Sequence, residues 1–279
     1  MNTAAVRVAR LAGAVGAEIS GIDLREPLPA EQRAAVRRIW LENGVVFLRD
    51  QPLTADQFLA FAEAIGTPVE YPFVNGIAGY PTIIEVKKLE HERVNFGGVW
   101  HTDTAYFERP PMATLLLARE VPPQGGDTLF ASQVAAYEAL SDGMKRLLAT
   151  LGCVNSSDKA DTSRTREDRI AEGGRGERRS YEAVHPAVRV HPETGQRALY
   201  MNAGHTVRFA GMSEAESAPL LAFLFEHQKK EEFTCRFRWQ PGSLALWDNR
   251  CVQHYPVNDY HGHRRVMHRI TLEGDVPQG

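Results

Sequence analysis

A strict alternation of apolar and polar side chains runs through FTCRFRW, residues 233–239. Successive side chains of a β-strand point to opposite faces, so this period of two predicts a strand that is buried on one side. The residues expected to face the core are Phe233, Cys235, Phe237 and Trp239, and those expected to face outward are Thr234, Arg236 and Arg238. The stretch therefore indicates a core built on strands.

Seven further segments have the composition of strands, at residues 45–49, 82–87, 114–121, 187–191, 198–202, 243–247 and 265–272. Four segments have helical periodicity, at residues 31–42, 54–65, 132–151 and 213–230. The strands outnumber the helices and do not alternate regularly with them. This pattern favours an antiparallel sandwich or barrel, mainly β with flanking helices, over a doubly wound parallel sheet.

Two of the expected helices begin with a capping box, in which two side chains satisfy backbone N–H groups of the first turn. Thr54 and Gln57 have the required spacing at one helix, and Ser213 and Glu216 have it at another. The helices at 31–42 and 54–65 are amphipathic, so we expect them to pack on a sheet. The two longer helices would cover the outside of the core.

The chain has 279 residues, of which 43% are apolar and 24% are charged, the balance of an ordinary globular protein. A chain of this length can form a full core without disulfides, and we expect a single domain over residues 1–279. It carries 32 Lys and Arg residues against 35 acidic residues, without a basic run. We therefore expect a small-molecule partner, with no nucleic acid and no membrane bound. We also expect a homo-oligomer.

Cysteine usage and hydropathy bear on the compartment. No apolar stretch approaches the roughly 20 residues that span a bilayer, and the first residues lack a signal-peptide pattern. Cys153, Cys235 and Cys251 are odd in number, lie far apart and form no CxxC pair. We expect buried thiols in a reducing environment, and hence a cytoplasmic protein.

One segment departs from the pattern of the rest of the chain. Residues 155–180 read NSSDKADTSRTREDRIAEGGRGERRS, with almost no large apolar side chains and with charges of both signs. A polar insertion of this length is either a disordered loop or a lid over a functional site. Both interpretations stay open on the sequence alone.

Histidine and carboxylate side chains supply the candidate metal ligands. His101 and Asp103 are two residues apart, so on an extended segment both point to one face and can bind a single ion. His254 follows 153 residues later, which gives two histidines and one carboxylate. This set is typical of non-haem Fe(II) oxygenases, whereas a closed zinc site needs a fourth protein ligand. A rival pair, His261 and His263, lies in a glycine-containing turn without a carboxylate and is interpreted as solvated.

The expected last strand, residues 265–272, carries two arginines on one face. Its alternation places Arg265, Met267, Arg269 and Thr271 on one side and Val266, His268, Ile270 and Leu272 on the other. The two guanidinium-bearing residues are then about 13 Å apart at their Cα atoms. Arginine binds carboxylate and sulfonate groups with a fork of parallel hydrogen bonds. An exposed arginine pair on an edge strand is the alternative.

Five motifs in sequence order carry a resemblance to a known family. They are GAEISGIDL at 16–24, HTD at 101–103, GGDT at 125–128, WDNR at 247–250 followed by His254, and RRVMHR at 264–269. Together they resemble the taurine dioxygenase/TfdA family of Fe(II)/2-oxoglutarate-dependent dioxygenases. The similarity runs from about residue 10 to residue 273.

The resemblance implies a double-stranded β-helix (jelly-roll) core, with Fe(II) held by His101, Asp103 and His254. It implies that Arg265 and Thr128 bind the cosubstrate 2-oxoglutarate and that Arg269 lies near the acidic group of the primary substrate. The implied reaction uses O2 to hydroxylate a small organic anion of the sulfonate, sulfate ester or aryloxyalkanoate type. Succinate and CO2 are the coproducts.

The substrate pocket departs from the taurine-specific pattern. Tyr71 aligns with a substrate-contacting tyrosine of the family, but the histidine expected shortly before it is absent. His205 stands where taurine enzymes carry an aromatic ring, either as a substrate contact or as a structural residue in a loop after Asn202. The polar segment also lacks the phenylalanine of their lid. We therefore predict an anionic substrate other than taurine.

Two other classes of function compete with the oxygenase. A non-catalytic jelly-roll binding protein could keep the core pattern, but would not need all three ligands and both arginines. A metal-dependent hydrolase would need a carboxylate base and usually a second metal cluster, and the sequence offers neither.

Overall fold

The computed structural model describes residues 6–95, 97–159 and 180–279. Most of the polar segment predicted as a loop or lid, residues 160–179, lies outside the described residues. Its two described ends lie side by side, because the Ser180 hydroxyl donates to Asp158 Oδ2 at 2.8 Å and Tyr181 N donates to Ser157 Oγ at 2.9 Å.

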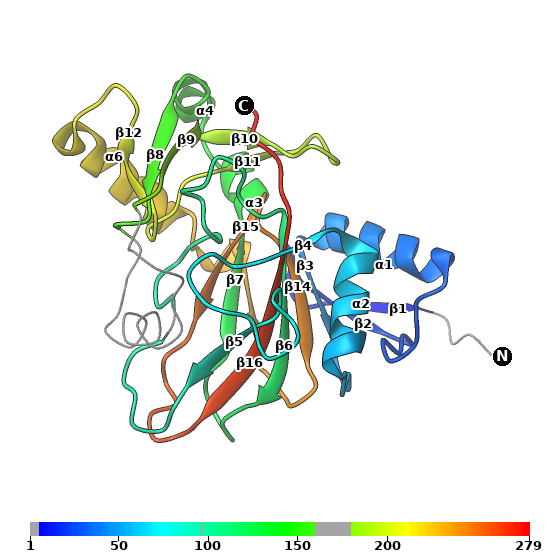
Figure 1. Ribbon diagram of the computed structural model, residues 1–279. Coiled ribbons are helices and arrows are strands. Elements are labelled where there is room, and N and C mark those ends of the chain that lie inside the picture. Colours follow the sequence, from blue (N-terminus) through cyan, green and yellow to red (C-terminus); the bar gives the residue numbers. More distant parts are fainter. Residues whose placement is uncertain (1–5, 96, 160–179) are drawn as a thin grey trace.

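Half of the described strands belong to one large, mainly antiparallel sheet (Figure 1). In spatial order it contains β1 (Arg7–Arg10), β2 (Ala17–Ser20), β3 (Val45–Leu48), β14 (Leu244–Asp248), β6 (Ala113–Glu120), β16 (Arg265–Leu272) and β4 (Pro68–Val69), while β5 (Ile84–Lys88) also pairs with β16. Within this sheet only β2 and β3 pair in parallel.

A smaller antiparallel sheet faces the large one. It consists of β13 (Thr234–Phe237), β7 (Thr128–Ser132) and β15 (Val252–Pro256). A continuous apolar core joins side chains from both sheets, among them Phe47, Phe130, Phe237, Trp247 and Met267. The molecule is therefore β-rich, with two sheets around one core, as the sequence predicts.

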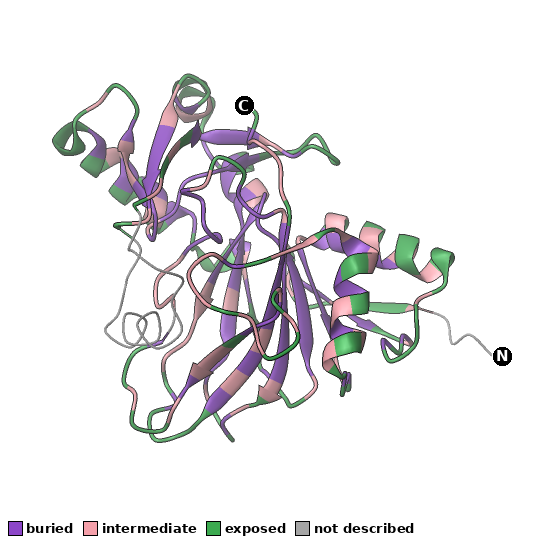
Figure 2. Cartoon of the chain, in the orientation of Figure 1, coloured by how far each residue is buried: buried purple, intermediate pink, exposed green. Residues whose placement is uncertain are grey.

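The central strands of the large sheet, β3, β14 and β6, are buried on both faces, because helices cover the side away from the small sheet. Leu115 and Leu117 of β6 pack toward α1 (Ala30–Asn43) and α2 (Ala55–Ile65), whereas Leu116 packs between the sheets. Figure 2 shows the central strands as mostly buried and the outer faces of α1 and α2 as exposed. Burial on both faces explains why these strands read as continuous apolar runs without alternation.

A third group of elements lies beyond one end of the sheets (Figure 1). It contains the strands β8 (Gly152–Ser156), β9 (Glu182–Pro186), β10 (Val188–Val190), β11 (Arg197–Leu199) and β12 (Thr206–Phe209). It also contains α3 (Gln133–Glu138), α4 (Asp142–Leu148), α6 (Glu214–His227) and the short 3-10 helix η1 (Glu231–Phe233). These elements share their own apolar cluster, which includes Cys153, Phe209 and Leu224.

Several local predictions are confirmed. Both capping boxes form, at Thr54 with Gln57 and at Ser213 with Glu216. The alternation that begins at Phe233 is present, although Phe233 itself ends η1 and the strand starts at Thr234. Its apolar side chains are buried and both arginines are exposed.

One helix prediction is wrong. Residues 132–151 form two helices, α3 and α4, and not one. The hydroxyl of Ser141 accepts a hydrogen bond from Met144 N and so begins α4 as its N-cap. The apolar residues continue through the break because both helices pack on the same cluster, so periodicity does not reveal it.

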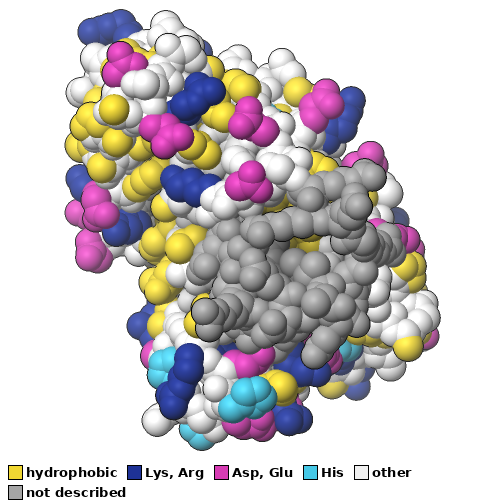
Figure 3. Space-filling model, turned by 60° about the vertical axis from the view of Figure 1, so that its left-hand side comes forward, with side chains coloured by type: hydrophobic (Ala, Val, Ile, Leu, Met, Phe, Trp, Pro, Cys, Tyr) yellow, Lys and Arg dark blue, Asp and Glu magenta, His cyan; other side chains and the backbone are white. Residues whose placement is uncertain are grey.

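The surface charges, the cysteines and the second histidine pair can also be placed in the structure. On the face drawn in Figure 3, basic and acidic side chains of the described residues are interspersed. Cys153, Cys235 and Cys251 are free and buried, and His261 and His263 are exposed. In the described part of the chain, no helix has the length and apolar character needed to cross a membrane.

Candidate active site

His101 and His254 are placed by a backbone bridge between two distant segments. His101 N donates to His254 O at 3.1 Å and His254 N donates to His101 O at 2.8 Å. Residues that exchange both hydrogen bonds in this way are direct cross-strand neighbours with side chains on the same face. The two imidazole rings accordingly lie 4.2 Å apart between centroids. His254 lies within β15, which the sequence analysis did not predict as a strand.

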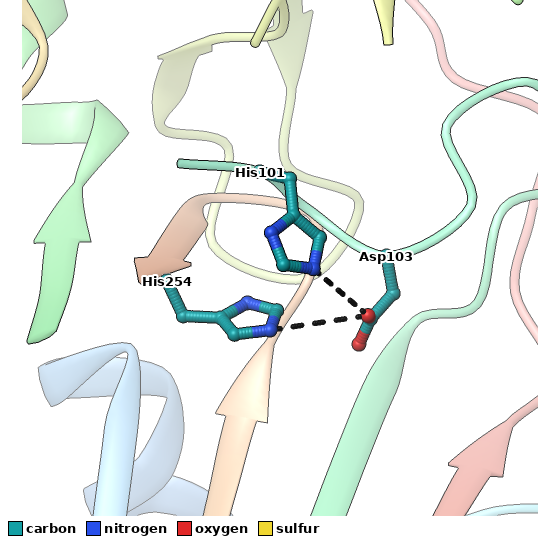
Figure 4. Close-up of side chains that lie close together, drawn as sticks. All are labelled: His101, Asp103 and His254. Carbon is teal, nitrogen blue, oxygen red and sulfur yellow. Dashed lines mark ion pairs between the residues drawn. The ribbon is translucent and has the colours of Figure 1, made fainter. Parts of the chain in front are cut away.

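Asp103 completes the cluster (Figure 4). Its Oδ1 atom lies 3.7 Å from His101 Nε2 and 3.9 Å from His254 Nε2, and the three residues are buried. A metal ion that bonds two donor atoms at about 2.1 Å each can join donors up to about 4.2 Å apart. Asp103 Oδ1 is closer than this to the Nε2 atom of either histidine, so one ion could bind Asp103 together with each of them. Thr104 has a φ of 42°, which is rare for a β-branched residue, and turns the chain directly after Asp103.

The protonation states of the three residues suit a divalent cation. Burial would raise the pKa of Asp103, but the positive charge of Arg269, together with the hydrogen bond from Thr114, helps to outweigh it and hold the pKa well below the usual carboxyl range. Burial and the neighbouring His101 lower the pKa of His254 well below 6.5. His101 Nδ1 lies 2.7 Å from Val99 O, so it carries the proton and leaves the Nε2 lone pair for a metal. An ionised carboxylate, the neutral imidazole of His254 and the imidazole of His101 therefore converge, and the residues fit a metal ion.

Arg265 and Thr128 meet around the indole ring of Trp239. Trp239 Nε1 donates to Thr128 Oγ1 at 2.9 Å, which leaves the hydroxyl proton of Thr128 available to a ligand. The guanidinium carbon of Arg265 lies 5.7 Å from the centre of the Trp239 ring. Arg265 is 7% exposed, and its Nε atom has no hydrogen-bond partner among the described residues. A buried cation beside a hydroxyl donor is suited to bind a carboxylate.

The two sheets bring these residues to the same interior. One face of β16 is covered by the helices, and the other face carries Arg265, Met267 and Arg269. Met267 belongs to the core between the sheets, so this second face points to the interior between them. On the small sheet, Thr128 of β7 is paired with Pro256 of β15, two positions beyond His254. Side chains two positions apart on a strand share a face, so Thr128 and His254 point to the same side.

Arg269 lies directly beside the three candidate metal ligands. Its Nη2 atom is 2.9 Å from Asp103 Oδ1, and both side chains are buried. The guanidinium also lies over the ring of Tyr71, 5.3 Å from its centre. In this structure the charge of Arg269 is neutralised by Asp103, which is itself one of the candidate metal ligands.

A series of aromatic rings leads away from Arg269 and the histidines. Phe73 contacts Tyr71 at 5.4 Å, Tyr106 at 6.1 Å and Tyr181 at 5.7 Å between ring centroids. The ring of His205 lies 4.9 Å from Tyr106 and 5.9 Å from His101. Its backbone N–H donates to Asn202 Oδ1 at 2.8 Å. In the loop after Asn202, His205 is thus held by its backbone N–H, and its imidazole ring faces His101.

A second group of candidate ligands, His191, Asp248 and Cys251, lacks free donor atoms. His191 Nδ1 accepts hydrogen bonds from Glu193 N and Thr194 N, so Nε2 carries the proton and donates it to Asp248 Oδ2 at 3.0 Å. Both oxygens of Asp248 also accept from Arg250. Burial raises the pKa of the Cys251 thiol well above its usual value. This group is an ionic hydrogen-bond network and does not suit a metal.

The sequence identified His101, Asp103 and His254 as ligand candidates, but it did not reveal the residues that support the site. Trp239 was placed on the inward face of its strand, yet nothing indicated that it joins Thr128 to Arg265. Phe73, Tyr106 and Tyr181 carry no motif, and only their proximity in the folded chain groups them.

Comparisons with known proteins agree with this geometry. Residues 7–271 match the family model described as taurine catabolism dioxygenase TauD, TfdA family. The chain is 37% identical to an alpha-ketoglutarate-dependent sulfate ester dioxygenase of Pseudomonas putida, over 96% of this chain and 90% of that one. It is 35% identical to an alkylsulfatase of Acinetobacter baylyi, over 99% of this chain and 88% of that one.

A solved structure is also similar over nearly the whole chain. The crystal structure of a taurine dioxygenase from Burkholderia xenovorans has a TM-score of 0.84 and 34% sequence identity, and the match covers 98% of this chain and 93% of that one. The sequence, the fold and the metal-binding cluster all lead to one conclusion. The chain belongs to the TauD/TfdA family of alpha-ketoglutarate-dependent dioxygenases.

Proposed function

We propose that this dioxygenase uses Fe(II) held by His101, Asp103 and His254, with 2-oxoglutarate bound by Arg265 and Thr128. We further propose that its two sheets form a double-stranded β-helix within a single domain. When bound, Fe(II) and 2-oxoglutarate supply the oxygen activation that couples release of succinate and CO2 to hydroxylation of a substrate C–H bond. The convergence of two imidazoles, that of His254 being neutral, and one ionised carboxylate on one point supports the metal assignment.

The protein side chains bind and orient the reactants. Arg265 is a buried cation whose Nε has no described hydrogen-bond partner, so a ligand carboxylate would neutralise it and accept its hydrogen bonds. Thr128 would donate its hydroxyl proton to the same carboxylate, since Trp239 already donates to its oxygen. Trp247 and Phe130 pack against the ring of His254 and shield it from water.

The primary substrate is proposed to be a small organic anion with an apolar body. Arg269 would bind the sulfate, sulfonate or carboxylate group, which would replace its contact with Asp103 once that oxygen binds the metal. The aromatic series from Tyr71 through Phe73 to Tyr181 offers apolar surface beyond this charge. A sulfate ester with an alkyl chain fits this arrangement better than a compact zwitterion such as taurine, and the two relatives described above act on this type of compound by name.

A substrate panel tests this assignment. Taurine, alkyl sulfonates, alkyl sulfates and aryloxyalkanoates are compared by the rate of substrate-dependent succinate release. Alkyl sulfates or longer sulfonates are expected to have higher specificity constants than taurine, and Arg269→Ala is expected to raise the KM of each anion. Taurine as the preferred substrate would refute the proposed class. An anion preference that survives Arg269→Ala would refute the role of Arg269, and no succinate release with any compound would favour a binding protein.

A further inference from the structure

The WDNR motif at 247–250 places the buried side-chain amide of Asn249 beside Asp103, one of the three candidate metal ligands. Asn249 lies in the turn between β14 and β15 and is 1% exposed. Its backbone carbonyl accepts a hydrogen bond from the hydroxyl of Thr102 at 2.7 Å. Its side chain contacts Trp247, Asp103 and Thr114, so it reaches both segments that support the candidate metal ligand.

The neighbours of Asn249 fix the orientation of its amide group. Oδ1 accepts from Trp247 Nε1 at 3.0 Å and from Asp103 N at 3.3 Å. Both of these groups can only donate, so the oxygen must face them and the NH2 group must face the other way. Nδ2 therefore donates to Thr114 Oγ1 at 2.9 Å.

The same logic fixes the hydroxyl of Thr114. Thr114 is fully buried and lies 2.6 Å from Asp103 Oδ2 through its Oγ1 atom. Because Oγ1 already accepts from Asn249, its single proton is directed to Asp103. Oδ2 of Asp103 thus accepts a hydrogen bond, and Oδ1 is the atom nearest to the two histidines.

We propose that Asn249 is a positioning residue that acts through Thr114 to present a single oxygen of Asp103 to the metal. This inference rests on the proposed metal site. The relay runs from Trp247 through the Asn249 amide and the Thr114 hydroxyl to Asp103, and the amide also holds the backbone of Asp103. Partners of this kind orient metal ligands, and their loss typically weakens metal binding about 10- to 100-fold.

Three variants of the full chain test the relay, with Co(II) as the probe. Thr114→Val removes the hydroxyl while it keeps the shape of the side chain, and Thr114→Ser restores the donor. Asn249→Asp replaces the NH2 donor by an oxygen, which competes with Asp103 for the Thr114 proton. The dissociation constant of Co(II) and its visible d–d spectrum are measured under anaerobic conditions, together with the free energy of unfolding.

The proposal predicts that Thr114→Val and Asn249→Asp raise the Co(II) dissociation constant about 10- to 100-fold and change its spectrum. Thr114→Ser should stay close to wild type. Ser217→Ala is the matched control, because Ser217 is also fully buried and accepts a hydrogen bond from Phe209 N, but lies in α6. It should lower stability without any change in Co(II) binding.

Two failures are distinguishable. If Asp103→Ala abolishes Co(II) binding but folded Thr114→Val and Asn249→Asp keep the wild-type affinity and spectrum, the relay is overturned and the metal site is not. Co(II) affinity that is equal in wild type and Asp103→Ala would overturn the proposed metal site itself. If one relay variant does not fold, the other provides the comparison, and a common effect of Thr114→Val and Thr114→Ser would also reject the hydroxyl's role.

Discussion

Arg265 is buried and forms no ion pair among the described residues, which sets it apart from Arg264 and Arg269. Arg264, its neighbour in sequence, is exposed and lies 3.2 Å from Glu90. Arg269 lies 2.9 Å from Asp103. Burial lowers the pKa of Arg265, which reflects the cost of keeping a charge in this position. A bound carboxylate would offset that cost.

The first prediction concerns Arg265→Ala. Loss of one partner of a buried ion pair costs about 3 to 5 kcal/mol, so the dissociation constant of 2-oxoglutarate should rise more than about a hundredfold. The constant for the primary substrate should change far less. Arg264→Ala is the control and should change neither constant, because its side chain faces solvent. Binding of 2-oxoglutarate that is unaffected by Arg265→Ala would reject the assignment.

At the level of elements, an ionic network fixes the turn between β14 and β15. Arg250 donates to both oxygens of Asp248 and to Glu193 Oε1 at 2.8 Å. Glu193 also binds Arg37 of α1, so the turn is linked to that helix. Burial would raise the pKa of Asp248, but Arg250 and His191 outweigh it and lower the pKa to about 2. The carboxylate therefore stays ionised in the core.

The second prediction follows for Arg250→Met. It leaves the charge of Asp248 buried without its main partner and should reduce the free energy of unfolding by about 3 to 5 kcal/mol. Chemical denaturation measures this change. Arg38→Ala is the comparison, because Arg38 and Glu42 are exposed and 3.5 Å apart, and it should cost less than about 1 kcal/mol. Equal effects of the two variants would contradict a structural role for the network.

The elements that could be predicted from sequence are those that a local signal specifies. The capping boxes at Thr54 and Ser213 and the alternation through Phe237 need no knowledge of the fold. β15 escaped prediction because it is short and mixes Gln253 and His254 with apolar residues. The break before Ser141 escaped because both helices bury their apolar faces in one cluster.

The residues of the candidate site likewise fall into those that a local sequence signal specifies and those that only the folded chain brings together. His101, Asp103 and His254 could be assigned because residue type and spacing indicate metal chemistry. The relay joins Thr114 to Asn249, 135 positions away, and the ring contact joins Trp239 to Arg265 across two intervening strands. No local pattern encodes either contact. The ion pair between Arg269 and Asp103 depends on the packing of β16 and could not be read from the strand alone.

At the scale of the whole molecule, the buried His185 and the half-buried His268 couple stability to pH. Burial lowers the pKa of His185, and burial with the nearby Arg119 lowers the pKa of His268. A histidine with a lowered pKa stays neutral in the folded chain while the unfolded chain takes up a proton below about pH 6.5. The free energy of unfolding therefore falls as the pH drops below this value.

The third prediction is that stability rises between pH 5 and pH 7, by up to about 1.4 kcal/mol per pH unit for each such histidine. His268→Gln removes one of these groups and should flatten the dependence. Urea denaturation at several pH values gives the slope for both proteins. A slope that is identical in wild type and variant would show that His268 titrates alike in the folded and unfolded chains.

The central claim is that His101, Asp103 and His254 hold Fe(II) with 2-oxoglutarate beside it. The most direct measurement is the visible absorbance of the anaerobic protein after Fe(II) and 2-oxoglutarate are added. The account predicts a weak charge-transfer band that requires both additions and is lost in Asp103→Ala and His254→Ala, while circular dichroism shows that the fold survives. Absence of the band in the wild-type protein, or an unchanged band in either variant, would contradict the assignment of these residues as the iron ligands.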